Sequence, residues 1–383
     1  MAAAAVLAVV TLGANMPPPL FPRYVDAYGL SALEITSIFA TYTLTIAPTV
    51  LVFGPLSDAV GRRPVLIFAL VAAAAAAVVL GAAQNVWWLY VGRALQGVAV
   101  GASQGPSAAA LADTHPRGDV AKAAVVGTLM ICVGSALGPI TAGVLAQYFP
   151  APLHLSFMVE LSLVMIVLGV LIVSYPPTKT STGSSVRISW PSVPAGIRLA
   201  YTRATSSAVL AWVIPGLFMA LAPTILHTTL DTNNSVVSGS FVALMMVSSA
   251  LAQLGGRGRH PAALQVLGLV LLLAGLAIFV GGASTGSVPL CGVSAGVAGA
   301  GQGLAFSGAA QVVGALAPSE RRGNVMSLFF VAIYLGVTIS IVGVGLLSTR
   351  VGLLPAVQLF SLAAAAACLC SIVSHARTLD RLS

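Results

Sequence analysis

Residues 54–64 read Gly-Pro-Leu-Ser-Asp-Ala-Val-Gly-Arg-Arg-Pro, and an apolar stretch of membrane-spanning length lies on each side of them. The run holds three charged residues, Asp58, Arg62 and Arg63, whereas residues 35–53 and 65–92 hold none. A short charged turn between two apolar spans must lie at the membrane surface, where its charges remain in water. The stretch therefore predicts that the chain crosses a membrane before it and again after it.

The composition excludes an ordinary water-soluble protein. Of the 383 residues, 58% are hydrophobic and 7% are charged, whereas a soluble domain carries about 25% charged residues. We interpret the net charge of +8 as the basic loops of a membrane protein. Aromatic residues do not alternate with the basic ones, so we expect the lipid bilayer as a partner and no nucleic acid.

Twelve stretches reach the length of about 20 mainly apolar residues that a membrane-spanning helix needs. Backbone amides in lipid must be paired within the protein, so helices are expected, and the alternating pattern of a barrel is absent. The predicted spans are residues 2–22, 32–53, 65–83, 86–111, 121–147, 153–175, 205–229, 236–255, 262–282, 287–316, 324–347 and 353–374.

The placement of Lys and Arg indicates the orientation. With the amino terminus inside, fourteen of the seventeen basic residues fall in cytoplasmic segments, which is the known bias of membrane proteins. Arg23 and Arg350 fall outside, and Arg93 lies within a span. We therefore predict a multi-pass protein of the cell (inner, cytoplasmic) membrane with both termini in the cytoplasm. No basic segment precedes the first apolar residues, so a secretory signal peptide is not predicted.

The chain repeats itself across residues 176–204, a Ser-, Gly- and Pro-rich stretch that we interpret as a cytoplasmic linker. Gly61-Arg-Arg-Pro parallels Gly258-Arg-His-Pro, and Gln96-Gly parallels Gln302-Gly. Six spans separate the members of each pair, so matched segments cross the membrane in the same direction. We predict an all-α membrane protein of twelve transmembrane helices in two six-helix bundles, related by a parallel pseudo-two-fold repeat. The predicted domains are an N-terminal bundle (1–175), the linker (176–204) and a C-terminal bundle with a short cytoplasmic tail (205–383).

The pattern Gly-x-Leu-Ser-Asp-x-x-Gly-Arg-Arg-Pro resembles the loop between helices 2 and 3 of major facilitator superfamily transporters and fills that family's pattern almost completely. The resemblance implies a conformational gate made of Gly54, Asp58, Gly61, Arg62 and Arg63. In the family, this carboxylate is thought to engage the start of helix 11 when the cytoplasmic side is closed, which points to the Glu320-Arg-Arg segment here. A helix start attracts a carboxylate because it carries a partial positive charge. The alternative is that the two arginines only anchor the inner face.

A second motif, Gly92-Arg93-Ala-Leu-Gln96-Gly97, resembles Arg-x-x-Gln-Gly in helix 4 of the same family. The resemblance implies a part for Arg93 in proton coupling, and Gln96, one turn later, lies on the same helix face. A charge at the centre of a span costs about 2.5–3.5 kcal/mol on insertion scales, so Arg93 is expected to face the bundle interior. The alternative is that its side chain reaches the outer headgroups.

Glu160 is the one acidic residue placed well within an apolar span. Such a carboxyl is a candidate for binding a proton or a cationic substrate, although a position near the outer water is the alternative. Drug exporters that the chain resembles often have an acidic residue in helix 1, where this chain has Asn15, so Asn15 is also a candidate. The prolines that follow it, Pro17 to Pro19 and Pro22, either interrupt the helix and free carbonyls or mark its end at the surface.

The fifth span contains Gly134-Ser-Ala-Leu-Gly138-Pro139-Ile-Thr-Ala-Gly143. It resembles Gly-x-x-x-Gly-Pro-x-x-Gly-Gly, the motif of exporters that exchange substrate for protons, with Ala142 in place of one glycine. Glycines four residues apart also form a flat ridge for helix packing. The added Pro139 and Gly143 favour the antiporter interpretation over uptake.

The resemblance implies a secondary active transporter, and the residues favour proton-coupled export of a small, mainly apolar compound, a drug or a metabolite, by alternating access as a monomer. The alternative is an uptake symporter or facilitator for a small organic solute, and a membrane enzyme or sensor is a third possibility. No catalytic constellation or cofactor motif is present, so we expect neither enzyme activity nor a cofactor. The four cysteines, Cys132, Cys291, Cys368 and Cys370, lie in apolar stretches where too few ligands converge for a metal site, and we interpret them as packing residues.

Overall fold

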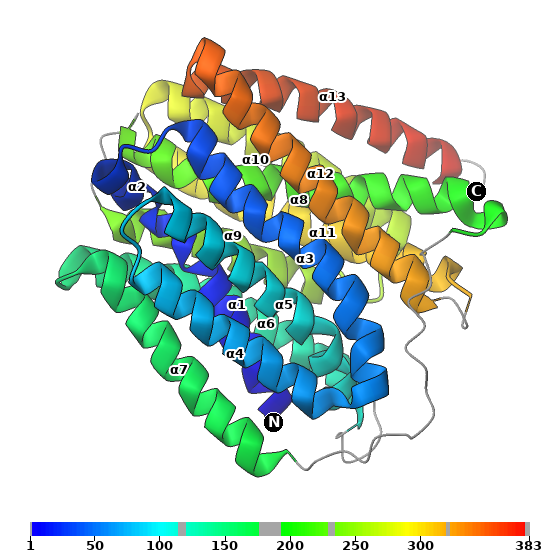
Figure 1. Ribbon diagram of the computed structural model, residues 1–383. Helices are drawn as coiled ribbons and strands as arrows, with labels where there is room; N and C mark the ends of the chain where they lie inside the picture. The colour runs from blue at the N-terminus through cyan, green and yellow to red at the C-terminus, as the bar shows by residue number, and fades with distance from the viewer. Residues whose placement is uncertain (1, 114–119, 176–192, 229–233, 319–321, 380–383) are drawn as a thin grey trace. The chain divides into compact units, whose positions relative to one another are not determined.

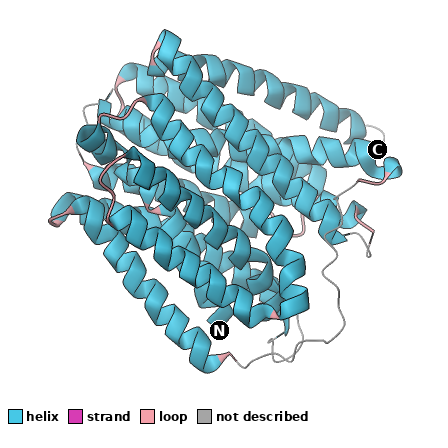
Figure 2. Cartoon of the chain, viewed as in Figure 1, coloured by secondary structure: helices cyan, strands magenta, loops and turns pink. Residues whose placement is uncertain are grey.

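The computed structural model describes residues 2–113, 120–175, 193–228, 234–318 and 322–379 (Figure 1), and these residues are almost entirely helical (Figure 2). The helices before the predicted linker are α1 (Ala2–Asn15), α2 (Pro17–Tyr28), α3 (Ala32–Val60), α4 (Arg62–Gly81), α5 (Val86–Asp113), α6 (Val120–Tyr148) and α7 (Pro152–Ser174). Those after it are η1 (Ala195–Ile197), α8 (Arg198–Thr228), α9 (Ser235–Gly255), α10 (Pro261–Thr285), α11 (Val288–Leu316), α12 (Arg322–Val351) and α13 (Leu353–Leu379).

The helices match the twelve predicted spans, with α1 and α2 together forming the first. In the described part of the chain, eleven helical segments are long and apolar enough to cross a membrane. The twelfth, α5, has the length but falls short in apolar character, because it carries Arg93, Gln96, Gln104 and two serines. The predicted all-α membrane fold is confirmed.

The contacts within the chain define two compact units. The first contains Met1–Leu30, Thr41–Ile188 and Asn234–Ala243, and the second contains Ser31–Ala40, Ser189–Asn233 and Leu244–Ser383. The start of α9 thus belongs to the first unit and the start of α3 to the second. Most of the expected linker lies outside the described residues, and α8 already begins at Arg198. The domain boundaries 1–175, 176–204 and 205–383 therefore stay a prediction.

The turns of the internal repeat share one backbone feature. Gly61 has φ 94° and Gly258 has φ 78°, a conformation that residues with a Cβ rarely adopt. Pro64 then lies in the first turn of α4, and Pro261 is the first residue of α10, where a proline costs no helical hydrogen bond. The two turns therefore start their helices by the same local chemistry.

Helix α1 occupies the centre of the first unit, where it packs against α6, α5 and α7. The glycines of the fifth-span motif allow its closest approach. A Cβ on Gly134 would lie 2.2 Å from the Ala8 carbonyl oxygen, and one on Gly138 would lie 2.2 Å from that of Leu12. On another side of α6, a Cβ on Gly143 would lie 2.6 Å from the Ser235 carbonyl oxygen of α9. The motif glycines thus bring helix backbones together, as small residues do in membrane bundles.

We expect Gly138→Ala to destabilise the protein by about 1–3 kcal/mol, because the added methyl meets a carbonyl on a buried helix that cannot move aside. The matched control is Gly169→Ala in α7, where an added Cβ meets open space and alanine is the better helix former. Thermal unfolding of the purified variants in detergent measures both. A melting temperature of Gly138→Ala equal to that of Gly169→Ala would contradict this packing.

Candidate functional site

The first span is interrupted where its prolines begin. Pro17 and Pro18 have no N–H, so the carbonyls of Gly13 and Ala14, four residues earlier, lose their α-helical donors. The chain bends at Met16 between α1 and α2, and α2 continues to Tyr28. This agrees with the expectation that the prolines interrupt the helix. The alternative, that they mark the end of the helix at the surface, is wrong, because helix continues to Tyr28.

Two side chains of α5 bond the carbonyls whose α-helical donors the prolines remove, although Gly13 also accepts from the Met16 N–H at 3.1 Å. Arg93 Nη1 donates to the Ala14 carbonyl oxygen at 2.9 Å, and Gln96 Nε2 donates to that of Gly13 at 2.9 Å. Arg93 Nη1 also donates to Gln96 Oε1 at 2.7 Å. The carbonyls of Gly13 and Ala14 therefore hold Gln96 and Arg93 in place.

Arg93 lies inside the first unit and is only 1% exposed. Its guanidinium carbon lies 4.2 Å from the ring centroid of Tyr42 in α3, a cation–π contact that lowers the cost of burying the charge. The predicted interior position is thus confirmed, and the alternative of a side chain that reaches the outer headgroups is wrong.

Glu160, on α7, completes this buried cluster. Its side chain is 1% exposed, it accepts a hydrogen bond from Gln96, and it interacts electrostatically with Arg93. A Cβ on Gly13 would lie 1.8 Å from Glu160 Oε1, so only glycine lets the carboxyl come this close to α1. In the part of the chain that the structure describes, Glu160 Oε2 has no hydrogen-bond partner. The alternative position near outer water is wrong.

A tyrosine that the sequence reasoning missed also joins the cluster. Tyr24 of α2 is 1% exposed and interacts electrostatically with both Arg93 and Glu160. Its hydroxyl has no hydrogen-bond partner among the described residues. The sequence analysis ended the first span at residue 22, whereas the helix continues to Tyr28, so the interior position of Tyr24 could not be read from the predicted span.

Asn15 makes its hydrogen bonds elsewhere. Its Nδ2 donates to the Thr11 carbonyl oxygen at 2.8 Å and to Ser135 Oγ of α6 at 3.4 Å. These bonds join α1 to the helix that carries the glycine motif. Asn15 therefore ties helices together beside the cluster and is not among its bonded members.

The charged turn at residues 54–64 forms its own small network. Arg62 pairs with Asp58 and donates to Ser57 Oγ at 2.9 Å, and its Nε lies 3.6 Å from Asp113 Oδ2 at the end of α5. Asp113 was not among the predicted site residues, although it is an acidic residue at the end of a span on the side of the basic loops. The expected partner segment of Asp58, Glu320 to Arg322, lies largely outside the described residues.

This network is weak and exposed. The side chains of Asp58 and Asp113 are 67% and 60% exposed, and ion pairs in such surroundings contribute about 1 kcal/mol or less. Arg63 instead donates to the Ile172 carbonyl oxygen at 2.7 Å in the last turn of α7, where a cation is favoured. A Cβ on Gly54 would meet open space, so nothing in the structure explains a glycine there.

Comparison with known proteins identifies the family. The model of the Major Facilitator Superfamily matches residues 3–341. The chain belongs to the major facilitator superfamily. The chain shares 30% identity over 148 residues with the tetracycline resistance protein, class H, of Pasteurella multocida, an alignment that covers 37% of this chain and 36% of that protein. It shares 34% identity over 140 residues with the class G protein of Vibrio anguillarum, covering 35% and 34%. The aligned part thus spans about a third of these relatives.

Solved structures support the fold over nearly the whole chain. A bacterial homologue of the human lysosomal transporter Spinster, in an inward-facing and unoccupied conformation, matches with a TM-score of 0.73 at 12% identity, over 98% of this chain and 92% of that one. A point mutant of the nucleoside transporter NupG matches with a TM-score of 0.75 at 11% identity, over 97% and 98%. At these identities the likeness concerns the fold alone.

Gln96→Leu should lower the free energy of unfolding by about 1–3 kcal/mol, because it deprives the buried Gly13 carbonyl of its side-chain donor and Arg93 of an acceptor. The control is Gln253→Leu on α9, whose amide bonds only Ser249 on its own helix. Chemical denaturation in detergent, followed by circular dichroism, compares the two. An equal loss of unfolding free energy in both variants would contradict a central role of Gln96 in the cluster.

Proposed function

We propose that this protein exports a small, mainly apolar compound in exchange for protons by alternating access. The observation that carries the proposal is the buried carboxyl of Glu160, which has one oxygen without a partner among the described residues and lies in the field of Arg93. A carboxyl inside a membrane protein is a functional group by default, because its burial is otherwise unfavourable.

In this proposal Glu160 carries the proton, and Arg93 responds to whether the Glu160 carboxyl is charged or neutral. Protonation removes the negative charge that faces Arg93 and turns the carboxyl from an acceptor into a donor. Gln96 would then lose a charged acceptor, and through the Gly13 carbonyl this change reaches the bend between α1 and α2. Proton binding would thereby shift the equilibrium between two conformations of the first span. An antiporter requires such a link between proton binding and conformation.

An aromatic cluster in the second unit supports an apolar substrate with flat rings. Trp212 of α8 meets Phe306 of α11 edge to face at 5.7 Å, and Phe330 and Tyr334 of α12 continue the group at 6.4 Å. In the described part of the chain, Trp212 Nε1 has no hydrogen-bond acceptor. Rings of this kind bind planar compounds by stacking. The relatives are named for resistance to tetracycline, which makes that compound the first probe.

The placement in the cell is part of the same proposal. We place the protein in the cytoplasmic membrane as a monomer with both termini in the cytoplasm, since the basic residues then gather inside. The Asp58–Arg62–Asp113 network would lie on the cytoplasmic side and act as a gate, because pairs this exposed break at small cost during each cycle.

Glu160→Gln should abolish the dependence of export on the proton gradient, because the amide keeps the size of the carboxyl but cannot bind and release the proton. The assay loads inverted vesicles with a pH-sensitive dye and measures tetracycline uptake together with proton release. Glu34→Gln is the control, since that carboxyl bonds Ser31 at the start of α3. If the Glu160→Gln variant released protons as the wild type does, Glu160 would not be the residue that couples proton movement to export.

The direction of transport separates export from the uptake alternative. A strain without the gene should accumulate more tetracycline, and a protonophore should raise accumulation in the wild type to the same level. Greater accumulation with the gene than without it would favour uptake.

Arg62→Gln should slow transport several-fold while changing the free energy of unfolding by about 1 kcal/mol or less, because the broken pairs are exposed. The same substitution at the exposed Arg257, in the matching turn of the second half, serves as the control. Transport rates and melting temperatures of the reconstituted variants test this. A large loss of stability without a transport defect would argue for an anchoring role alone.

A further inference from the structure

A long groove lies on the second unit between α12 and α13. The two helices meet at Gly352, where φ is 86°, and they diverge towards the start of α12 and the end of α13 (Figure 1). The first turns of α8 lie between them at the wide end. A cavity of about 810 Å³ occupies the wide end and one of about 430 Å³ the narrow end. Val209, Leu210 and Ala367 line both cavities, so the two form one groove.

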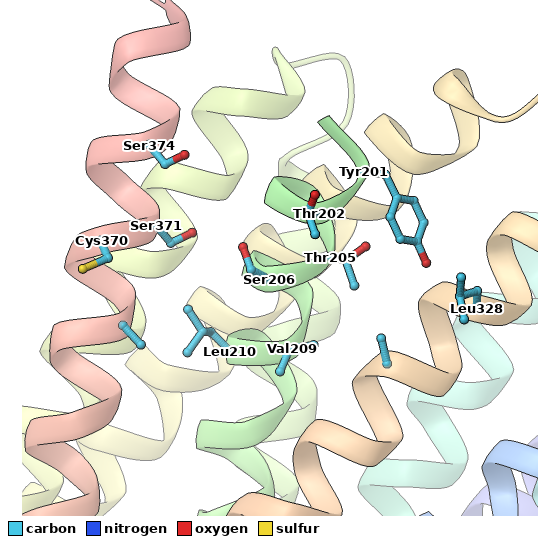
Figure 3. Close-up of a pocket in the computed structure, with 12 residues that line it drawn as sticks. Tyr201, Thr202, Thr205, Ser206, Val209, Leu210, Leu328, Cys370, Ser371 and Ser374 are labelled. Atoms are coloured by element: carbon cyan, nitrogen blue, oxygen red, sulfur yellow. The ribbon is translucent and has the colours of Figure 1, made fainter. Parts of the chain in front are cut away.

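Both ends of the groove are mainly apolar and both carry hydroxyl groups. The walls of the narrow end include Val213, Val344, Leu347 and Phe360, together with Ser340. The wide end has more hydroxyl groups, with Thr202 and Ser206 on α8 facing Ser371 and Ser374 on α13 (Figure 3). An apolar trough with hydroxyl groups along it matches an amphipathic molecule.

The wide end also has polar groups that are not fully bonded. Tyr201 and Thr205 are each 7% exposed and line the cavity. Their side chains interact with each other, but neither hydroxyl has a well-formed hydrogen bond within the described residues. Beside them, Ser207 Oγ bonds His375 Nε2 at 2.8 Å and Ser371 Oγ at 3.1 Å, which holds α13 to α8 at this point. Buried hydroxyls without partners indicate a site where another polar group can bind.

The length of the groove indicates a chain-like occupant. Its lining on α13 runs from Leu359 to Ser374, which corresponds to about 22 Å at 1.5 Å per residue. The hydrocarbon of one leaflet is about 15 Å deep, half of the bilayer core. One acyl chain of a membrane lipid therefore fits along the groove, with room for its glycerol at the hydroxyl end, whereas a compact drug-like molecule would leave much of it empty.

The charges near the wide end favour a negative headgroup. The sequences of α8, α12 and α13 contain no Asp or Glu. Arg198 and Arg203 belong to the first turns of α8, the turns that carry Tyr201, Thr202 and Thr205 of the wide end. Arginines at the cytoplasmic surface attract anionic lipids.

We propose that the groove between α12 and α13 is a binding site for one anionic glycerophospholipid of the membrane. One acyl chain lies along the apolar walls, and the headgroup lies at Tyr201 and Thr205, near Arg203. The bound lipid fills the gap between the two diverging helices. The site is separate from the buried cluster around Glu160, and it does not depend on what the protein transports.

The test uses the purified full chain and native mass spectrometry, with phosphatidylglycerol and phosphatidylcholine of identical acyl chains added in turn. The wild type should retain one phosphatidylglycerol and prefer it by about five-fold for each arginine that contacts the headgroup. Gly343→Leu and Ala367→Phe place new side chains in the groove and should abolish this retention. A Cβ at Gly343 meets open space, so the change fills the groove without a clash in the helix.

Two controls separate this site from ordinary surrounding lipid. Gly169→Leu makes the same change at an exposed glycine in the middle of α7, where a Cβ also meets open space, and it should retain the lipid. Arg203→Gln should reduce the preference for phosphatidylglycerol, whereas Arg350→Gln, in the last turn of α12 at the other end, should not. Thermal melting confirms that each variant is folded.

Three outcomes would overturn the proposal. The first is unchanged retention of phosphatidylglycerol in both groove-filling variants, and the second is equal retention of the two lipids by the wild type. The third is that the filled variants lose binding of a compact apolar dye such as Nile red but keep the lipid, because the groove would then take transport substrates.

Discussion

The structure around the candidate site depends on one constraint: a polar group removed from water must find a partner inside the protein. The prolines that follow Met16 leave the carbonyls of Gly13 and Ala14 without α-helical donors. Arg93 and Gln96 of α5 supply donors at 2.9 Å, and in return a buried guanidinium obtains acceptors that it cannot do without. The bend in the first span and the buried charge of the fourth are therefore two halves of one arrangement. Neither would be favourable without the other.

Close helix packing makes this arrangement possible. The glycines of α6 let it lie against α1 at Ala8 and Leu12, and Gly13 leaves space for the carboxyl of Glu160. Small residues bring backbones near enough for side chains on α5 and α7 to reach the bend of α1. The same glycines that resemble an exporter motif therefore have a packing role that the structure shows directly, and any role in exchange of substrate for protons would act through that packing.

The charged groups of the first unit fall into two kinds, and their burial separates their roles. Arg93 and Glu160 are each 1% exposed, so a change in the charge of either one is costly and must be answered by rearrangement. The carboxylates that pair with Arg62, those of Asp58 and Asp113, are largely exposed, so these pairs can form and break easily. This division suits a transporter, in which a buried group controls coupling and a surface network opens and closes. The groove that we propose for a lipid, in the second unit, is a third kind of site, in which hydroxyl groups line a mainly apolar trough.

Hydropathy and the charged turn at residues 54–64 were sufficient to predict the spans, the helical class and the family, because burial in lipid forces apolar runs of a set length and keeps charges at their ends. The interior position of Arg93 also followed from the sequence, since a charge within a span has few other places to go. The sequence did not determine which partners these residues have. That Asp113 meets Arg62, that Tyr24 joins Glu160, and that Asn15 bonds towards α6 depend on how helices far apart in the chain rotate against one another. Such rotation is set by the summed fit of many small side chains, and no local pattern in the sequence records it.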